Sequence, residues 1–146
     1  MWVGIQHLHG SFRYVVLLLL VAALVLAFRG LSGKKAFTEG QRKVTLWALM
    51  ATHIQLVLGL VLYLGQWGMY SLMLKDMSNP EARFKALEHP VGMILGIVCI
   101  TLGYSLSKRA GTDKGKHLRV AIWMGLGLLI VFAQIPWPFM KSFGTW

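Results

Sequence analysis

Four long apolar stretches divide this 146-residue chain, and they constrain its fold more than any other feature. They run roughly over residues 5–28, 44–67, 90–107 and 118–139. Hydrophobic residues make up 56% of the chain and charged residues 14%, and the charges gather between the apolar stretches. About 20 apolar residues form a helix that crosses a bilayer. We therefore expect one all-α domain over residues 1–146, a polytopic membrane protein built as an up-down four-helix transmembrane bundle.

The charges between the stretches predict the orientation of this bundle. Loops 29–43 and 108–119 each carry five basic residues against one acid, whereas connection 68–89 carries three of each sign. Basic loops stay in the cytoplasm, so both termini are expected on the outer, periplasmic side of a bacterial inner membrane. Because the same two loops account for most of the net charge of +10, we expect no nucleic-acid partner.

The outer connection also carries helix signals. The segment Ser78-Asn79-Pro80-Glu81 offers a cap residue, a proline for the first helical position and an acid for the first turn. A short helix is therefore expected to begin there and to meet the third apolar stretch at Pro90. That proline either kinks one long helix or separates two, and His89 stands at the junction.

Two histidines, His9 and His89, are predicted to lie level in the membrane. His9 precedes residue 28 by 19 positions and His89 precedes residue 107 by 18, which places both about 27–29 Å from the inner face. The first and third helices of an up-down bundle run parallel and diagonally opposite. Imidazoles that face each other across a bundle are normal axial ligands of haem.

Residues near this pair suggest how a cofactor would be accommodated. Gly92 and Gly96 share the helix face of His89 and would leave flat space for a porphyrin, although the same spacing is a GxxxG packing motif. Arg13 lies one turn from His9 and would neutralise a haem propionate or pair with Glu88.

Arg83 and Lys85 are further candidates for propionates at the outer surface. Snorkelling to the lipid headgroups is an equally good interpretation of these two side chains.

The remaining histidines allow several interpretations. His53 lies ten residues from Lys43, about 15 Å deep, and would ligate a second haem or form a hydrogen bond across the bundle. His117 is expected at the cytoplasmic interface, too far in depth to pair easily with His53. His7 lies about 200° around the helix from His9, so both cannot face the core.

Four segments give the chain a resemblance to known proteins: His7-Leu8-His9-Gly10-Ser11-Phe12-Arg13-Tyr14, Thr52-His53-Ile54-Gln55, Glu88-His89-Pro90 and Ile135-Pro136-Trp137-Pro138-Phe139. With them the chain resembles the small four-helix membrane proteins of the cytochrome b-like family. More distantly it is similar to one half of heme A synthase. The resemblance implies haem b, with His9 and His89 as its ligands. This chain has one bundle where heme A synthase has two, so the synthase reaction is not expected.

The leading functional hypothesis is a b-type haem protein that transfers electrons near the periplasmic face. Its partners would be the lipid bilayer, a quinone and other subunits of a respiratory complex. No Cys-x-x-Cys-His motif is present, so the haem would be held non-covalently. No carboxylate pair or nucleophile–base pair is apparent, which favours an electron carrier over an independent enzyme.

Two alternatives remain open at the level of sequence. The chain would also suit a cofactor-free structural or assembly subunit of a larger membrane complex. A weaker possibility is an outward-facing copper or zinc site formed by His7, His9 and His89.

Overall fold

The structure, a computed structural model, describes residues 2–137, and all the regular secondary structure of these residues is helical. Four helical segments are long and apolar enough to cross a membrane, which confirms the predicted all-α class. The helices are α1 (Trp2–Gly30), α2 (Glu39–Gly65), α3 (Trp67–Met73), α4 (Pro80–Arg83), α5 (His89–Arg109) and α6 (Asp113–Gln134). A π-helical turn over Phe84–Glu88 joins α4 to α5.

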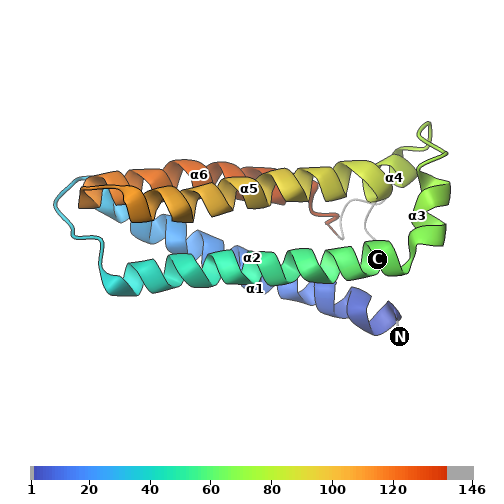
Figure 1. Ribbon diagram of the computed structural model, residues 1–146, viewed down its shortest axis with the longest axis horizontal. Coiled ribbons are helices and arrows are strands. Elements are labelled where there is room, and N and C mark those ends of the chain that lie inside the picture. Colours follow the sequence, from blue (N-terminus) through green and yellow to red (C-terminus); the bar gives the residue numbers. More distant parts are fainter. Residues whose placement is uncertain (1, 138–146) are drawn as a thin grey trace.

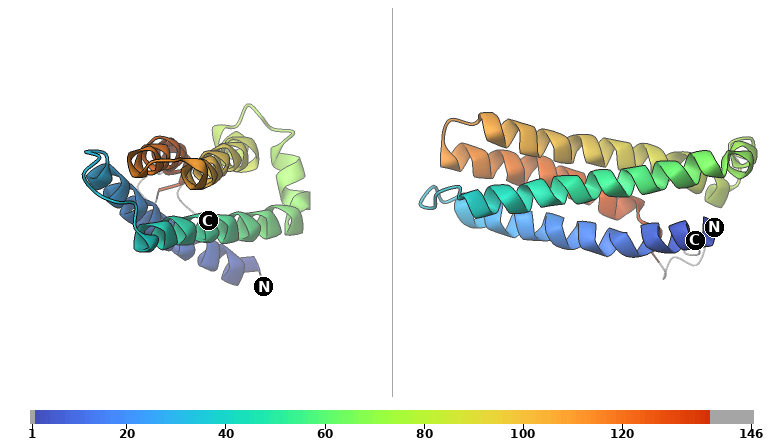
Figure 2. Two further views of the ribbon diagram at one scale, coloured as in Figure 1. Left: turned by 60° about the vertical axis from the view of Figure 1, so that its left-hand side comes forward. Right: turned by 60° about the horizontal axis from the view of Figure 1, so that its bottom comes forward.

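The long helices lie side by side as a four-helix bundle (Figures 1 and 2). Helix α1 packs against α2 and α6, and α5 packs against the same two helices, so α1 and α5 occupy diagonal positions. The α1–α2 and α5–α6 connections lie at one end of the bundle, and α3 and α4 lie at the other (Figure 1). The two basic loops therefore share an end, as the sequence predicts.

Three helix boundaries differ from the expected ones. The third span is one continuous helical segment over Pro80–Arg109, so Pro90 does not separate two helices. The second span ends at Gly65, and the short helix α3, which the sequence pattern did not predict, follows it. The fourth ends at Gln134, just before the Ile-Pro-Trp segment. Residues 138 and 139, expected at its close, lie outside the described part of the chain.

Polar caps begin the helices that follow the two basic loops. Thr38 and Gln41 form a reciprocal capping box at the start of α2, and the Thr112 hydroxyl accepts a hydrogen bond from the backbone of Gly115 at the start of α6. These bonds satisfy N–H groups that have no partner inside their helix. The loops are thereby fixed at the helix ends.

Glycines bring α5 and α6 into close contact. A Cβ atom on Gly96 would lie 2.8 Å from a methyl carbon of Val131, and one on Gly127 would lie 2.6 Å from the Ile100 side chain. Gly103 approaches Met124 in the same way. Because lipid is as apolar as a protein core, close packing of small residues is a main source of helix association in membranes. Helices α5 and α6 therefore form the most closely packed pair of the bundle.

Gly127→Ala is expected to lower the free energy of unfolding by about 1–3 kcal/mol, because its methyl group would overlap Ile100 and the Gly96 carbonyl. Gly125→Ala is the matched control on the same helix, since its methyl group would make an ordinary contact with Leu24. Reversible unfolding in mixed micelles measures both. Equal stability of the two variants would contradict the close α5–α6 packing.

Candidate cofactor cavity

The structure brings His9 of α1 and His89 of α5 together in the half of the bundle that lies toward α3 and α4. Their ring centroids lie 6.4 Å apart and the ring planes make an angle of 75°. Two imidazoles on opposite sides of one metal ion, with bonds of about 2.0 Å, have centroids roughly 6 Å apart. The spacing of this pair therefore fits a single metal ion held between two diagonal helices.

Helix α2 holds His9 in place. The Gln55 side chain donates a 2.8 Å hydrogen bond to the His9 carbonyl. A Cβ atom on Gly59 would lie 3.1 Å from Cε1 of the His9 ring, so glycine gives the imidazole its space. The His9 Nδ1 atom is buried and has no hydrogen-bond partner among the described residues. The ring is thus positioned by its backbone and by packing.

The end of α6 orients His89. Its Nδ1 atom lies 2.7 Å from the carbonyl oxygen of Gln134. Because a carbonyl can only accept, Nδ1 carries the proton, and in the neutral ring the lone pair resides on Nε2. A hydrogen bond from the far nitrogen to a backbone carbonyl is the usual support of a metal-binding histidine. Gln134 is the last residue of α6, so the helix terminus supplies this carbonyl.

Pro90 produces an irregular turn directly before His89. Proline has no N–H, so it cannot donate to the carbonyl of Ala86 four residues earlier. The Tyr63 hydroxyl donates a 2.9 Å hydrogen bond to that carbonyl instead. The His89 N–H reaches back five residues to the Phe84 carbonyl, which defines the π-helical turn. Such turns are frequent at functional sites, and this one sets the position of His89.

His9 and His89 both line a cavity of about 560 Å³. This volume lies within the range of about 300–1,000 Å³ that is typical of ligand sites. Its walls come from α1, α2, α3, the π turn, α5 and the residues around the end of α6. The lining is mostly apolar, and its polar contributions include Arg13, Gln55, Tyr63, Tyr70 and Lys85. An apolar cavity with a few convergent polar groups is the usual form of a cofactor site.

Several polar atoms at this cavity are buried without a hydrogen-bond partner. They are His9 Nδ1, Arg13 Nε and Gln55 Oε1. Buried polar atoms in folded proteins nearly always have partners, because an unsatisfied group costs about 1–3 kcal/mol. A ligand with polar groups in this cavity would supply partners for these three atoms.

Arg13 is the cation at the cavity that lacks an acidic partner among the described residues. Its guanidinium donates to the Pro136 carbonyl at 3.4 Å and to the Tyr14 hydroxyl at 3.1 Å. Four of the five acids form ion pairs elsewhere: Glu39 with Arg42, Glu81 with Lys85, Glu88 with Arg83 and Asp113 with Lys116. The fifth, Asp76, accepts a hydrogen bond from the Ser78 hydroxyl. The predicted pair of Arg13 with Glu88 is therefore wrong.

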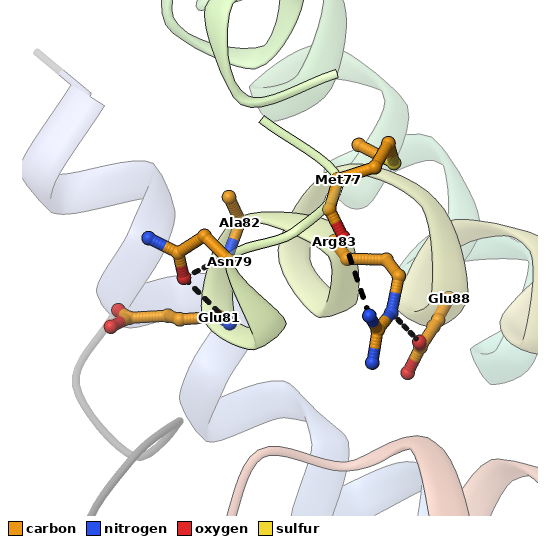
Figure 3. A network of polar contacts seen from close by, with 6 residues as sticks. All are labelled: Met77, Asn79, Glu81, Ala82, Arg83 and Glu88. Atoms are coloured by element: carbon orange, nitrogen blue, oxygen red, sulfur yellow. Dashed lines mark hydrogen bonds and ion pairs between the residues drawn. The ribbon is translucent and has the colours of Figure 1, made fainter. Parts of the chain in front are cut away.

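The other two predicted propionate ligands, Arg83 and Lys85, lie in α4 and in the π turn, and both are paired with acids. Arg83 donates to Glu88 at 2.7 Å and to the Met77 carbonyl at 3.3 Å (Figure 3). Lys85 donates to Glu81 at 2.6 Å, and it lines the cavity. Asn79 caps α4, where its side-chain oxygen accepts hydrogen bonds from the N–H groups of Glu81 and Ala82 (Figure 3). Among the three basic residues, Arg13 is the most available for an anionic ligand group.

The two glycines predicted to make room for a porphyrin lie elsewhere. Gly96 faces Val131 and Gly92 faces the Gln134 side chain, both at the α5–α6 contact. This placement agrees with the other interpretation of the two glycines, which is helix packing. Gly92 contributes indirectly, because it lets the end of α6, with the Gln134 carbonyl, approach His89.

The remaining histidines do not join the pair. His7 is exposed, although it also lines the cavity. His53 is exposed on α2, and its Nδ1 donates to the Leu49 carbonyl of its own helix at 2.9 Å, so the expected bond across the bundle is not formed. His117, expected at the interface, is fully buried against Phe37, with ring centroids 5.0 Å apart.

Sequence reasoning missed the aromatic side of the cavity. Tyr63 stacks on Tyr70 with ring centroids 4.6 Å apart, and both residues line the cavity. Burial and the neighbouring Tyr63 raise the pKa of Tyr70 above its ordinary value, so its phenol stays protonated. The sequence did offer one signal for Tyr63, the proline after His89. Pro90 leaves the Ala86 carbonyl without its helical N–H, so a donor from another helix is required.

The described residues contain no group of three His, Cys, Asp or Glu side chains that could hold a metal ion. This finding gives no support to a copper or zinc site of His7, His9 and His89. Comparison of the chain with protein-family models, curated proteins and solved structures gives no match. The family resemblance therefore stays a prediction, and the cavity alone carries the functional argument.

Tyr63→Phe is expected to lower the free energy of unfolding by about 0.5–2 kcal/mol, because it leaves the Ala86 carbonyl without a donor. In a Pro90→Ala background the backbone N–H of residue 90 can serve that carbonyl, so the same change should cost much less. A double-mutant cycle of unfolding in mixed micelles measures the coupling. Additive effects would show that the tyrosine does not compensate for the proline.

Proposed function

We propose that this chain is a b-type cytochrome of a bacterial inner membrane, with one haem b held between His9 and His89. The bound haem would supply a one-electron Fe(III)/Fe(II) couple. The observation that carries the proposal is the pair of histidines from diagonal helices, whose ring centroids lie 6.4 Å apart at a cavity of about 560 Å³. A second haem is not proposed, because His53 bonds to its own helix, His117 is buried against Phe37, and neither lines the cavity.

The chain's own residues provide the support that such a cofactor needs. The Gln134 carbonyl fixes the protonated nitrogen of His89, and Gly59 leaves space for the His9 ring. Arg13 would neutralise a propionate, since its Nε is buried without a partner and the described carboxylates do not pair with it. The apolar lining excludes water and keeps the cofactor in a low-dielectric environment.

The orientation of the site follows from the charge of the loops. The histidine pair lies in the half of the bundle that includes α3 and α4, opposite the two basic loops (Figure 1). If the basic loops face the cytoplasm, electron exchange takes place near the periplasmic face. The protein would act as an electron carrier or as a subunit of a respiratory complex.

The ligand assignment predicts the optical spectrum of the purified protein. Wild-type protein expressed with a haem supply should show reducible Soret and α bands with one haem b per chain. His9→Ala and His89→Ala should each abolish the six-coordinate spectrum, and imidazole added to His9→Ala should restore part of it. His7→Ala is the matched control, because His7 is exposed two residues from His9.

A reduced-minus-oxidised spectrum with a haem assay tests this prediction, and circular dichroism checks that each variant is folded. Folded, haem-supplied wild-type protein without a haem spectrum would overturn the proposal. It would then favour a cofactor-free structural subunit. Bleaching by His7→Ala alone would overturn the assignment of the ligands.

Arg13→Gln should lower the midpoint potential of the haem, on the order of tens of millivolts. A nearby positive charge favours the reduced, less positive iron, so its removal favours the oxidised form. Arg83→Gln is the control, because that cation is paired with Glu88. Spectroscopic redox titration measures both potentials. An equal or larger shift for Arg83→Gln would show that Arg13 is not the residue that pairs with the propionates.

A further inference from the structure

A second, shallower pocket lies on the outside of the bundle between α2 and α5. It has a volume of about 290 Å³ and is lined almost entirely by apolar side chains. Helices α2 and α5 pack less closely than α5 and α6, so a groove remains between them. The lining consists of His53 and Leu56 from α2, and of Ile94, Ile97, Val98, Thr101 and Leu102 from α5. We refer to these residues as the α2–α5 groove.

The groove shares a wall with the cofactor cavity. Leu56, Ile94 and Ile97 line both spaces. One layer of side chains therefore separates a molecule in the groove from a molecule in the cavity. The groove opens at the side of the bundle, so its occupant would come from the hydrocarbon region of the membrane.

His53 is an unusual residue for this position. It is exposed on the side of the bundle, at a depth about ten residues, or 15 Å, from the start of the apolar stretch. Polar side chains at such depth are rare, and they commonly mark functional sites. An occupant of the groove that pairs with the imidazole would offset the free-energy cost of a polar side chain at this depth.

The hydrogen bonds of the groove define the chemistry of that partner. His53 Nδ1 donates to the Leu49 carbonyl at 2.9 Å, so Nε2 of the neutral ring is an acceptor. The Thr101 hydroxyl donates to the Ile97 carbonyl at 2.8 Å, so its oxygen also offers acceptor lone pairs. An occupant of matching chemistry is apolar and carries hydroxyl donors.

We propose that the α2–α5 groove binds a lipid-soluble hydroquinone, with a hydroxyl group donating to His53 Nε2. An oxidised quinone has carbonyl acceptors in place of these donors, so the neutral imidazole should favour the reduced form. The choice of a hydroquinone among hydroxyl-bearing lipids rests on the proposed electron-carrier function. The acceptor character of the groove does not depend on the cofactor.

Binding is tested with duroquinol, the tetramethyl hydroquinone, on the full chain in phospholipid nanodiscs under anaerobic conditions. Empty nanodiscs of the same lipid correct for partition into the bilayer. Wild-type protein should bind duroquinol saturably and duroquinone at least about tenfold more weakly. His53→Phe, which keeps a ring but removes the acceptor, should weaken duroquinol binding about tenfold, the equivalent of one hydrogen bond.

Two further variants separate the acceptor from the shape of the site. His53→Gln keeps an acceptor in the groove and should retain most of the affinity. Ile54→Phe places a ring on the neighbouring residue of α2, which is exposed and does not line the groove, and it should bind like wild type.

Three outcomes would overturn the inference: binding that does not saturate above the empty nanodiscs, unchanged affinity in His53→Phe, and equal affinity for duroquinone. A dimer whose contact covers His53, shown by cross-linking, would assign the groove to a second copy and would also overturn it. Saturable duroquinol binding to a protein without a haem spectrum would support the binding site in the groove. It would at the same time contradict the proposed cytochrome function.

Discussion

The close approach of α5 to α6 determines much of the rest of this bundle. Glycines at 92, 96, 103 and 127 lie at this contact, so side chains of the facing helix pack directly against the glycine backbone. Helix α5 is consequently drawn toward α6, and its contact with α2 on the other side is looser. Space remains in the half of the bundle that lies toward α3 and α4, and the histidine pair lines this space.

The same contact places the hydrogen-bonding groups at the cavity. It brings the end of α6 to His89, where the Gln134 carbonyl orients the imidazole. On the opposite wall, Tyr63 compensates for the missing N–H of Pro90 and anchors the π turn. A bilayer offers no water to satisfy free backbone groups, so each irregularity of the helix needs a partner from another helix. The Gln134 bond and the Tyr63 bond together fix the position of His89, which lines the cavity.

Much of this arrangement could be predicted from the sequence because it depends on one-dimensional spacing. Hydropathy defined the spans, and the rise per residue along parallel helices placed His9 and His89 at one depth. Rotation about the helix axis and the closeness of neighbouring helices cannot be read in this way. The spacing of Gly92 and Gly96 suits a cofactor and a helix contact equally well, and the structure places both at α6. The partners of Arg13, and Tyr63 as a donor to Ala86, depend on contacts between helices.

The central claim is that His9 and His89 bind one haem from opposite sides. Electron paramagnetic resonance of the oxidised protein tests it most directly, because the spectrum of a low-spin ferric haem depends on its two axial ligands and on the angle between their planes. With imidazole planes 75° apart, the account predicts one highly anisotropic low-spin signal per chain, lost in either histidine variant. A high-spin ferric signal, or no haem signal from folded protein supplied with haem, would contradict it.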